Sequence, residues 1–319
     1  MKRRIIITIL VILFLIVLLL GISYYIVFNK ISKINYVDIP REEIELTAGV
    51  EENLEEYRNI ALFGIDTRDN TYDGSRTDCI IIASINEKTK EIKLVSVYRD
   101  TYLQIPNRGL DKVNHAYSYG GAALSMSTLN INLDLDITEF VTVNFESTKE
   151  IVDAIGGVEI TVTDKEATQI SGISKGGTYN LTGKQALEYG RIRKIDNDYV
   201  RTERMRTVVM AVFEKAKKMS ISELNTLTDK LFPEIYTNIS KSELFSLLPT
   251  IYSYKIVESQ GWPYKTKGIT LNGVWYGPPV TLEKNVKELH KELFKEENYE
   301  VTNKVKEIND LIINKTGYQ

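Results

Sequence analysis

The sequence predicts an α/β fold, an α/β/α sandwich around a central mixed β-sheet, with one N-terminal transmembrane helix. Two observations support this fold class. Apolar runs of strand length alternate with runs of helical period along residues 58–297. Gly-Gly pairs and a threonine cap mark several boundaries between these runs. Alternating strands and helices build a sheet that is covered by helices.

The folded part begins with a short buried strand and a hairpin, and helices follow. The predicted strands cover residues 60–64, 79–86, 91–97, 140–144 and 158–162. Helical period predicts helices over 122–133, 147–155, 183–189, 203–219, 241–252 and 282–294. Gly120-Gly121 opens the first helix, Gly156-Gly157 closes the second, and Thr182 caps the third. A section rich in glycine, proline and aromatic residues spans 261–279.

The N-terminal segment is long enough to cross a bilayer. Residues 5–28 carry no charge, and as a helix they are about 36 Å long, against a hydrocarbon core of about 30 Å. Residues 1–4, with Lys2, Arg3 and Arg4, form a short cytoplasmic tail. A cleaved signal peptide is the alternative, because Gly21-Ile22-Ser23 offers small residues at a cleavage spacing. We expect a single-pass membrane protein with its large domain outside the cytoplasm.

The rest of the chain divides into a spacer, one domain and a tail. Residues 29–57 are rich in glutamate and predict an acidic linker. Residues 58–297 form the extracytoplasmic domain, and residues 298–319 are expected to form a C-terminal tail. The size suits one large core or two small ones.

Composition excludes several classes of function. Forty Lys and Arg against 43 Asp and Glu give a net charge of −3, so we expect no nucleic-acid partner. The single cysteine, Cys79, excludes an intramolecular disulfide. Two histidines, His115 and His290, cannot build a His/Cys zinc site, and no G-x-S-x-G turn accompanies either one.

A dense group of arginines carries the functional signal. The segment from Gln185 to Arg206 contains five arginines, which are Arg191, Arg193, Arg201, Arg204 and Arg206. Forked, permanently charged donors at this density are typical of a phosphate or pyrophosphate site. The alternative is salt bridging with Asp196, Asp198 and Glu203. Together with the membrane segment, the arginines indicate a phosphorylated ligand derived from the membrane.

Carboxylates at predicted strand ends suggest a metal. Asp66 follows the first strand, Asp78 begins the second, and Arg99-Asp100 ends the third. Ligands of open α/β sheets bind at such ends. Two carboxylates without a nearby histidine suit Mg²⁺ that bridges a pyrophosphate. Surface ion pairs of Asp66 with Arg68 and of Asp78 with Arg76 are the alternative.

Several short motifs follow one another along the chain. They are ALFGID at 61–66, SRTD at 75–78, VYRD at 97–100, KVNHAY at 112–117 with Gly120-Gly121, DAIGGV at 153–158, and the segment 181–206. In these motifs the chain resembles the LytR-CpsA-Psr family of membrane-anchored cell-wall enzymes. The resemblance runs in order from about residue 58 to 218 and is loose beyond 220, mainly at 273–278.

The resemblance implies a phosphotransferase of the Gram-positive bacterial cell membrane. Such an enzyme moves a glycopolymer, with one phosphate, from an undecaprenyl-pyrophosphate carrier to a peptidoglycan sugar hydroxyl. Asp66 and Asp78 then correspond to Mg²⁺-associated carboxylates. The implied pyrophosphate-binding residues are Arg99, Lys112, Arg191, Arg193, Arg201 and Arg204. Met205 stands where the family usually has glutamine, so any contact made by that amide is absent.

The mechanism expected from this reading is phosphoryl transfer governed by positioning and charge neutralisation. The catalytic candidates are Asp66, Asp78, Arg99, Asp100, Arg191 and Arg193, with Asp100 or Asp66 as the acceptor of the hydroxyl proton. A non-catalytic polyprenyl-phosphate sensor or attenuator and a lipid-pyrophosphate hydrolase are the alternatives. Teichoic acid, capsule polysaccharide and other wall glycans all fit the implied polymer.

The prenyl chain requires an apolar channel. The residues offered for its wall are Leu224, Leu227, Leu231, Phe232, Leu244, Phe245, Leu248 and Ile251. An ordinary core has the same pattern.

Overall fold

The computed structural model describes residues 28–65 and 74–319. The predicted transmembrane helix, apart from Phe28, and the candidate metal ligand Asp66 therefore lie outside the described residues. Within the described ranges, no helix is both long and apolar enough to cross a bilayer.

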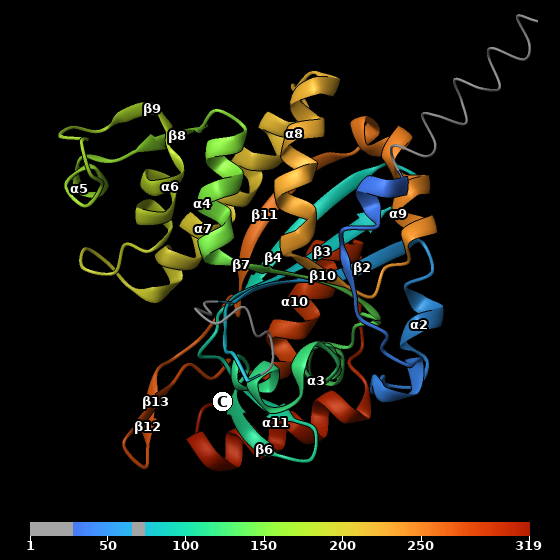
Figure 1. Ribbon diagram of the computed structural model, residues 1–319. Coiled ribbons are helices and arrows are strands. Elements are labelled where there is room, and N and C mark those ends of the chain that lie inside the picture. Colours follow the sequence, from blue (N-terminus) through green and yellow to red (C-terminus); the bar gives the residue numbers. More distant parts are fainter. Residues whose placement is uncertain (1–27, 66–73) are drawn as a thin grey trace, which may run out of the picture.

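A mixed sheet forms the centre of the molecule (Figure 1). Its strands lie in the order β1 (Asn35–Tyr36), β10 (Ile235–Thr237), β7 (Glu139–Asn144), β2 (Tyr57–Ile65), β3 (Thr77–Asn86), β4 (Glu91–Val97) and β11 (Lys255–Trp262). The pairs β1–β10, β2–β7 and β4–β11 are parallel, and the others are antiparallel. The predicted α/β fold with a mixed central sheet is confirmed.

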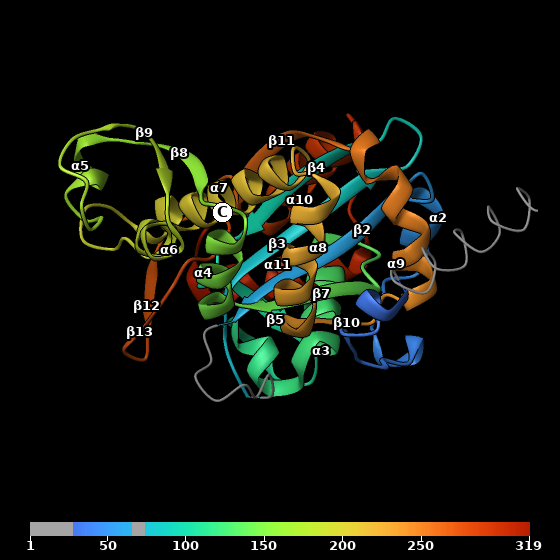
Figure 2. The same ribbon diagram turned by 45° about the horizontal axis from the view of Figure 1, so that its top comes forward.

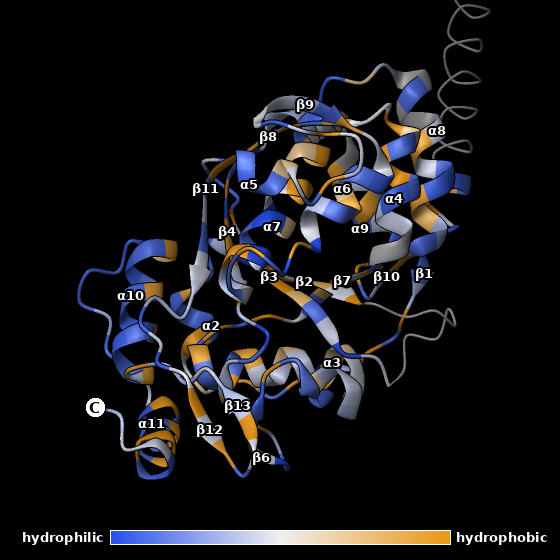
Figure 3. Ribbon diagram, turned by 90° about the vertical axis from the view of Figure 1, so that its left-hand side faces the viewer, coloured by the Kyte–Doolittle hydropathy of each residue, from blue (hydrophilic) through white to orange (hydrophobic). Residues whose placement is uncertain are grey.

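Helices cover both faces of this sheet (Figures 1 and 2). One face carries α3 (His115–Leu133), α10 (Leu282–Phe294) and α11 (Asn303–Thr316). The other carries α4 (Phe145–Ala154), α7 (Asp198–Ala216), α8 (Ile221–Leu231) and α9 (Lys241–Leu247). Side chains alternate along the strands, so Phe63 and Ile80 pack toward α3 and α10, whereas Leu62 and Ile81 face α7. Hydrophobic residues follow the strands through the middle of the molecule (Figure 3).

Three hairpins and several short helices complete the fold. The hairpins are β5 (Tyr102–Ile105) with β6 (Gly109–Lys112), β8 (Val158–Val162) with β9 (Gly177–Leu181), and β12 (Ile269–Leu271) with β13 (Val274–Tyr276). The short helices are η1 (Arg41–Glu43), α2 (Val50–Asn53), α5 (Asp164–Ala167), α6 (Gly183–Gly190), η2 (Phe232–Glu234) and η3 (Leu248–Ser253). The hairpin β12–β13 lies within the section rich in glycine, proline and aromatic residues, where the sequence pattern predicts no strand.

Two predicted boundaries are wrong, because both flanking segments belong to the domain. In the predicted linker, β1 pairs with β10, and Ile44 and Leu54 are buried in the main core. In the predicted tail, α11 places Val305, Ile308 and Ile312 in that same core. These spacings of three and four match one face of a helix, but charged residues surround them and obscure the pattern.

The long arginine-bearing helix starts earlier than predicted. Asn197 caps α7, because its Oδ1 accepts hydrogen bonds from the backbone N–H groups of Tyr199 and Val200, both at 3.1 Å. Arg201, Arg204 and Arg206 therefore lie on one continuous helix.

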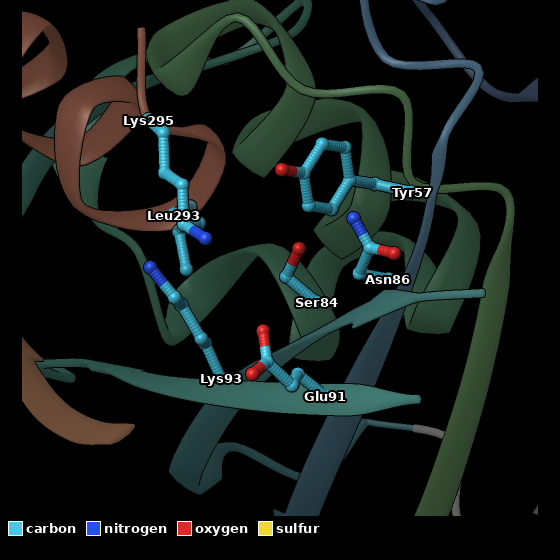
Figure 4. A pocket seen from close by; sticks show the side chains of 7 residues that line it. All are labelled: Tyr57, Ser84, Asn86, Glu91, Lys93, Leu293 and Lys295. Atoms are coloured by element: carbon cyan, nitrogen blue, oxygen red, sulfur yellow. The ribbon is translucent and has the colours of Figure 1, made fainter. Parts of the chain in front are cut away.

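The α10 side of the sheet is closely packed. A cavity of about 10 Å³ lies between α10 and strands β3 and β4 (Figure 4). This volume holds one water molecule at most. Its lining residues are Tyr57, Ser84, Asn86, Glu91, Lys93, Leu293 and Lys295. A ligand site is therefore to be sought elsewhere.

Candidate functional site

A β-bulge at the start of β3 positions Asp78. Gly64 pairs with Cys79 and Ile65 pairs with Thr77, so Asp78 is the extra residue opposite β2. A bulge bends its strand and redirects a side chain, and bulges are frequent beside active sites. Asp78 therefore lies at the sheet edge where β2 ends and β3 begins.

Three arginines from separate segments surround this carboxylate. Arg99, just past the end of β4, donates from Nη1 to Asp78 Oδ1 at 2.6 Å. Arg201 on α7 places Nη2 3.6 Å from Asp78 Oδ1 and 3.3 Å from the Asp78 carbonyl oxygen. Arg193, in the loop after α6, places Nη2 3.8 Å from Asp78 Oδ2. We call Asp78, Arg99, Arg193 and Arg201 the Asp78 cluster.

Burial and charge oppose each other at Asp78. Burial by itself raises the pKa of the Asp78 carboxyl group, but Arg201, Arg99 and Arg193 outweigh it and hold the pKa below its ordinary value. Asp78 is consequently an anion at neutral pH, held among cations. Arg201 is almost fully buried, whereas the Arg193 side chain is 59% exposed. The cluster is therefore fixed in the interior through Arg201 and accessible from solvent at Arg193.

Asp100 and Lys112 border the Asp78 cluster. Lys112 at the end of β6 places Nζ 2.6 Å from Asp100 Oδ1, and Arg99 Nε lies 3.4 Å from Asp100 Oδ2. The backbone here is tied down, because the Gly277 N–H donates to the Asp100 carbonyl oxygen at 2.9 Å and the Asn114 N–H donates to that of Arg99 at 3.2 Å. The structure thus brings Asp78, Arg99, Asp100, Lys112, Arg193 and Arg201 together.

Arg191 lies at the C-terminal end of α6 and is partly buried. Its backbone N–H caps the helix by bonding to the carbonyl oxygens of Leu187 and Glu188, both at 3.1 Å. Arg191 thereby begins the loop that carries Arg193 toward Asp78.

Arg204 has a different environment from the one its predicted role requires. Its Nε donates to Glu166 Oε1 at 2.6 Å, and Nη1 donates to Asp196 Oδ1 at 3.2 Å and to the Ile192 carbonyl oxygen at 3.3 Å. Nη2 donates to Asp196 Oδ2. We call Arg204, Glu166 and Asp196 the Arg204 network. Protein oxygens accept hydrogen bonds from most of the N–H groups of Arg204. The contacts of Arg204 therefore match the salt-bridge alternative and do not support pyrophosphate binding by this residue.

The two residues that follow Arg204 on α7, Met205 and Arg206, are also buried. Met205 is buried in an apolar cluster with Cys79, Ile81 and Leu94. Arg206 is buried and donates to Ser259 Oγ, and burial lowers the pKa of its guanidinium group. Met205 therefore fills the interior between α7 and the sheet at the position where the family usually has glutamine.

An apolar cavity of about 210 Å³ lies between the sheet and α4, α7 and α8. Its lining includes Cys79, the residue next to Asp78, and Gly64, which pairs with Cys79 at the bulge. Its wall consists of Leu62, Phe63, Gly64, Cys79, Ile81, Val141, Val143, Thr148, Ile151, Val208, Val209, Val212 and Leu231. Burial raises the pKa of the Cys79 thiol to about 12, as expected in such an apolar place.

Of the residues predicted for a channel wall, the side chains of Leu224, Phe245, Leu248 and Ile251 lie outside the described ones. Leu231 lines this cavity, whereas Leu227 packs in the neighbouring core of α4, β8 and α6. The wall comes mainly from strand residues and from Val208, Val209 and Val212 on α7. The apolar spacing of these three valines is visible in the sequence. Which strands α7 faces is decided by the order of strands in the sheet.

The donor chemistry of the site suits Mg²⁺ that arrives with a phosphate ligand. Among the described side chains, no group of three His, Cys, Asp or Glu residues is arranged to hold a metal. Mg²⁺ is commonly bound through one or two carboxylates and the phosphates of a substrate. Asp78 provides such a carboxylate, and Asp66, the second predicted ligand, lies outside the described residues.

The geometry defines a class of protein, an α/β domain with a cluster of arginines close to an apolar cavity. An amphiphilic phosphate ligand fits that combination. The profile of the LytR_cpsA_psr family matches residues 22–295, and the chain belongs to this family. The predicted family is confirmed.

Relatives with assigned activities are similar over most of the chain. The polyisoprenyl-teichoic acid–peptidoglycan teichoic acid transferase TagT of Bacillus subtilis (strain 168) is 35% identical over 225 residues, covering 66% of this chain and 70% of TagT. TagU of Bacillus mycoides (strain KBAB4), named as the same kind of transferase, is 32% identical over 288 residues, covering 86% and 92%.

Solved structures show the same fold. A LytR-CPS2A-psr family protein, YwtF (TagT), with bound octaprenyl pyrophosphate lipid superposes with a TM-score of 0.63 at 26% identity, covering 82% of this chain and 98% of that one. TagT bound to LI-WTA gives a TM-score of 0.66 at 28% identity, covering 82% and 98%.

Proposed function

We propose that this chain is a membrane-anchored, extracytoplasmic phosphotransferase that moves a glycopolymer-phosphate from an undecaprenyl-pyrophosphate carrier to a sugar hydroxyl of peptidoglycan. The observation that carries the proposal is the nearness of the Asp78 cluster to the apolar cavity, whose lining includes Cys79, the residue next to Asp78. A prenyl chain suits the cavity and a pyrophosphate suits the arginines, so one amphiphilic donor occupies both. Relatives named as teichoic acid transferases, and a relative with bound prenyl pyrophosphate, support this assignment.

The proposed chemistry uses the arginines for positioning and charge neutralisation. Arg99, Arg193 and Arg201 bind the pyrophosphate oxygens and stabilise the charge that develops during transfer. Mg²⁺ held by Asp78, with Asp66, supplies further neutralisation when bound. Arg201, being buried, keeps its guanidinium in place, and Arg193, being exposed, closes on the ligand from outside.

Asp100 is the proposed base. The acceptor hydroxyl oxygen forms a bond to the polymer-proximal phosphorus, the bond from that phosphorus to the bridging oxygen breaks, and undecaprenyl phosphate leaves. The hydroxyl proton passes to Asp100. Lys112 and Arg99 orient this carboxylate through contacts of 2.6 Å and 3.4 Å.

Product analysis tests the reaction. Full-length protein in detergent receives a labelled lipid-linked polymer, peptidoglycan and Mg²⁺. The transferase yields polymer-phosphate joined to glycan, and both Asp78→Ala and excess chelator lower this yield more than they lower binding of undecaprenyl monophosphate. Free polymer-phosphate as the product would instead assign a hydrolase, and unchanged lipid would assign a binding protein.

A variant at the cavity wall tests the donor site separately. Val209 lines the cavity and is 39% exposed, so Val209→Trp fills the cavity without entering the packed core. We expect weaker binding of undecaprenyl phosphate with an unchanged melting temperature. Val257→Trp is the matched control, because Val257 is 49% exposed on β11 outside the cavity lining. Equal lipid affinity in both variants would remove the cavity from the donor site.

A further inference from the structure

The hairpin β12–β13 presents an exposed tryptophan beside the candidate active site. Asn272 and Gly273, with φ of +50° and +81°, form its tight turn, and β12 and β13 pair in register. The hairpin projects from the same side of the molecule as the β8–β9 hairpin (Figures 1 and 2). Trp275 on β13 is 42% exposed, a large apolar surface on a projecting element. The core packing of the domain leaves this residue unexplained.

The indole ring is held in place by glycines. A Cβ atom added at Gly268 would lie 2.7 Å from Trp275 Nε1 and 3.0 Å from Cε2, and one at Gly277 would lie 3.4 Å from Cη2. The ring packs on backbone at 268, where any larger side chain collides with it. A ring that is supported by backbone and still exposed is a preorganised contact surface, because little side-chain freedom is lost on binding.

The hairpin is physically joined to the catalytic candidates. Gly277, two residues after Trp275, donates its N–H to the Asp100 carbonyl oxygen at 2.9 Å. Tyr276 packs on Tyr102 with ring centroids 4.6 Å apart, and Lys112 Nζ lies 5.8 Å from the Tyr276 centroid. Lys112 in turn contacts Asp100. The Trp275 ring lies on the other face of the hairpin from Tyr276 and beside Gly277, whose N–H bonds to Asp100, so a ligand on this ring lies near the backbone of the proposed base.

The donor occupies a different region. The cavity proposed for the donor lies between the sheet and α4, α7 and α8, and no residue of the hairpin belongs to its lining. The hairpin also lies apart from α8 in both views (Figures 1 and 2). This separation leaves the hairpin to a second, non-lipid substrate.

We infer that Trp275 is a binding platform for a sugar ring of the acceptor glycan strand. The inference rests on the proposed function, which requires an acceptor hydroxyl near Asp100. A pyranose presents a face of polarised C–H groups, and the negative face of an indole attracts such a surface. The platform positions the acceptor and takes no part in the bond-making step.

Fluorescence tests the platform without requiring catalysis. The chain has two tryptophans, and Trp262 is fully buried, so an accessible ligand acts on Trp275. Full-length protein is titrated with glycan strands freed of stem peptides. We expect a saturable change in emission that Trp275→Leu abolishes. An unchanged titration in Trp275→Leu, or a saturable change with anionic vesicles in place of glycan, would overturn the inference.

Kinetics separate this inference from the proposed function. In Trp275→Ala we expect the KM for glycan acceptor to rise about tenfold, with lipid-donor affinity unchanged. Val274→Ala is the control, because Val274 is 41% exposed on the neighbouring position of β13 and points to the opposite face. Transfer with a parental acceptor KM in Trp275→Ala would reject the platform and leave the function standing. Glycan binding through Trp275 without any transfer would reject the function and leave the platform.

Discussion

Arg201 and Arg204 lie three residues apart on α7 and are both almost fully buried, yet they belong to different structures. Arg201 contacts Asp78 at 3.3 to 3.6 Å, in a cluster open to solvent through Arg193. Arg204 donates to Glu166, Asp196 and a carbonyl oxygen inside the domain. Three cations share one carboxylate in the Asp78 cluster, whereas two carboxylates share one cation in the Arg204 network. The excess of positive charge, more than the presence of arginine, marks the anion site.

The largest expected effect on stability is in the Arg204 network. Arg204→Ala leaves the buried Glu166 and the more exposed Asp196 without their cation, and we expect a loss of about 3 kcal/mol in the free energy of unfolding. Urea denaturation measures it. Arg193→Ala is the control, since its side chain is 59% exposed and its removal should change stability by less than about 0.5 kcal/mol. A loss below about 1 kcal/mol in Arg204→Ala would show that the Arg204 network does not stabilise the fold.

The Asp78 cluster should show the opposite pattern. Arg193→Ala removes a charge-assisted contact to pyrophosphate worth about 1.5–3 kcal/mol, so transfer should fall about 10- to 150-fold. Arg193→Lys should also be impaired, because an ammonium group does not reproduce the fork. Transfer assays on folded variants decide, with the exposed neighbour changed in Lys194→Ala as the control. Parental turnover in Arg193→Ala would return this residue to the salt-bridge alternative.

A smaller expected effect is the pH dependence of the stability that the Arg204 network provides. Burial raises the pKa of Glu166, but hydrogen bonds from Arg204 and Thr163 outweigh it and hold that pKa below the ordinary value of 4.5. The resulting stability is complete above pH 4.5 and is lost as the pH falls through the folded-state pKa. Glu166→Gln should therefore lose less stability than the parent between pH 5 and 3. Thermal melts that show the same pH profile for Glu166→Gln and the parent would contradict this effect of Glu166. The pKa of Asp78 is also lowered, but Asp78 contributes equally to the parent and to the variant.

Local chemistry in the sequence determined the elements around the site. Apolar strand runs predicted β7 and β8 closely, and Thr182 predicted the start of α6, where the structure shows a capping box with Gln185. The match of 282–294 to α10 follows from a clear amphipathic period. Family resemblance then predicted one site from Asp78, Arg99, Arg193 and Arg201, which lie in short contiguous motifs, and the structure brings these four side chains together.

Only the tertiary structure decided what these residues contact. The bulge at Asp78 depends on the register of β2 with β3, and register is a property of pairing between segments. The cavity wall depends on the sheet order that sets β2, β3 and β7 beneath α7. Whether an arginine meets a carboxylate or stays available for a ligand depends on distant segments, as Glu166 and Asp196 show for Arg204. Sequence patterns record the local preference of a segment, whereas contacts between distant segments arise only when the chain has packed.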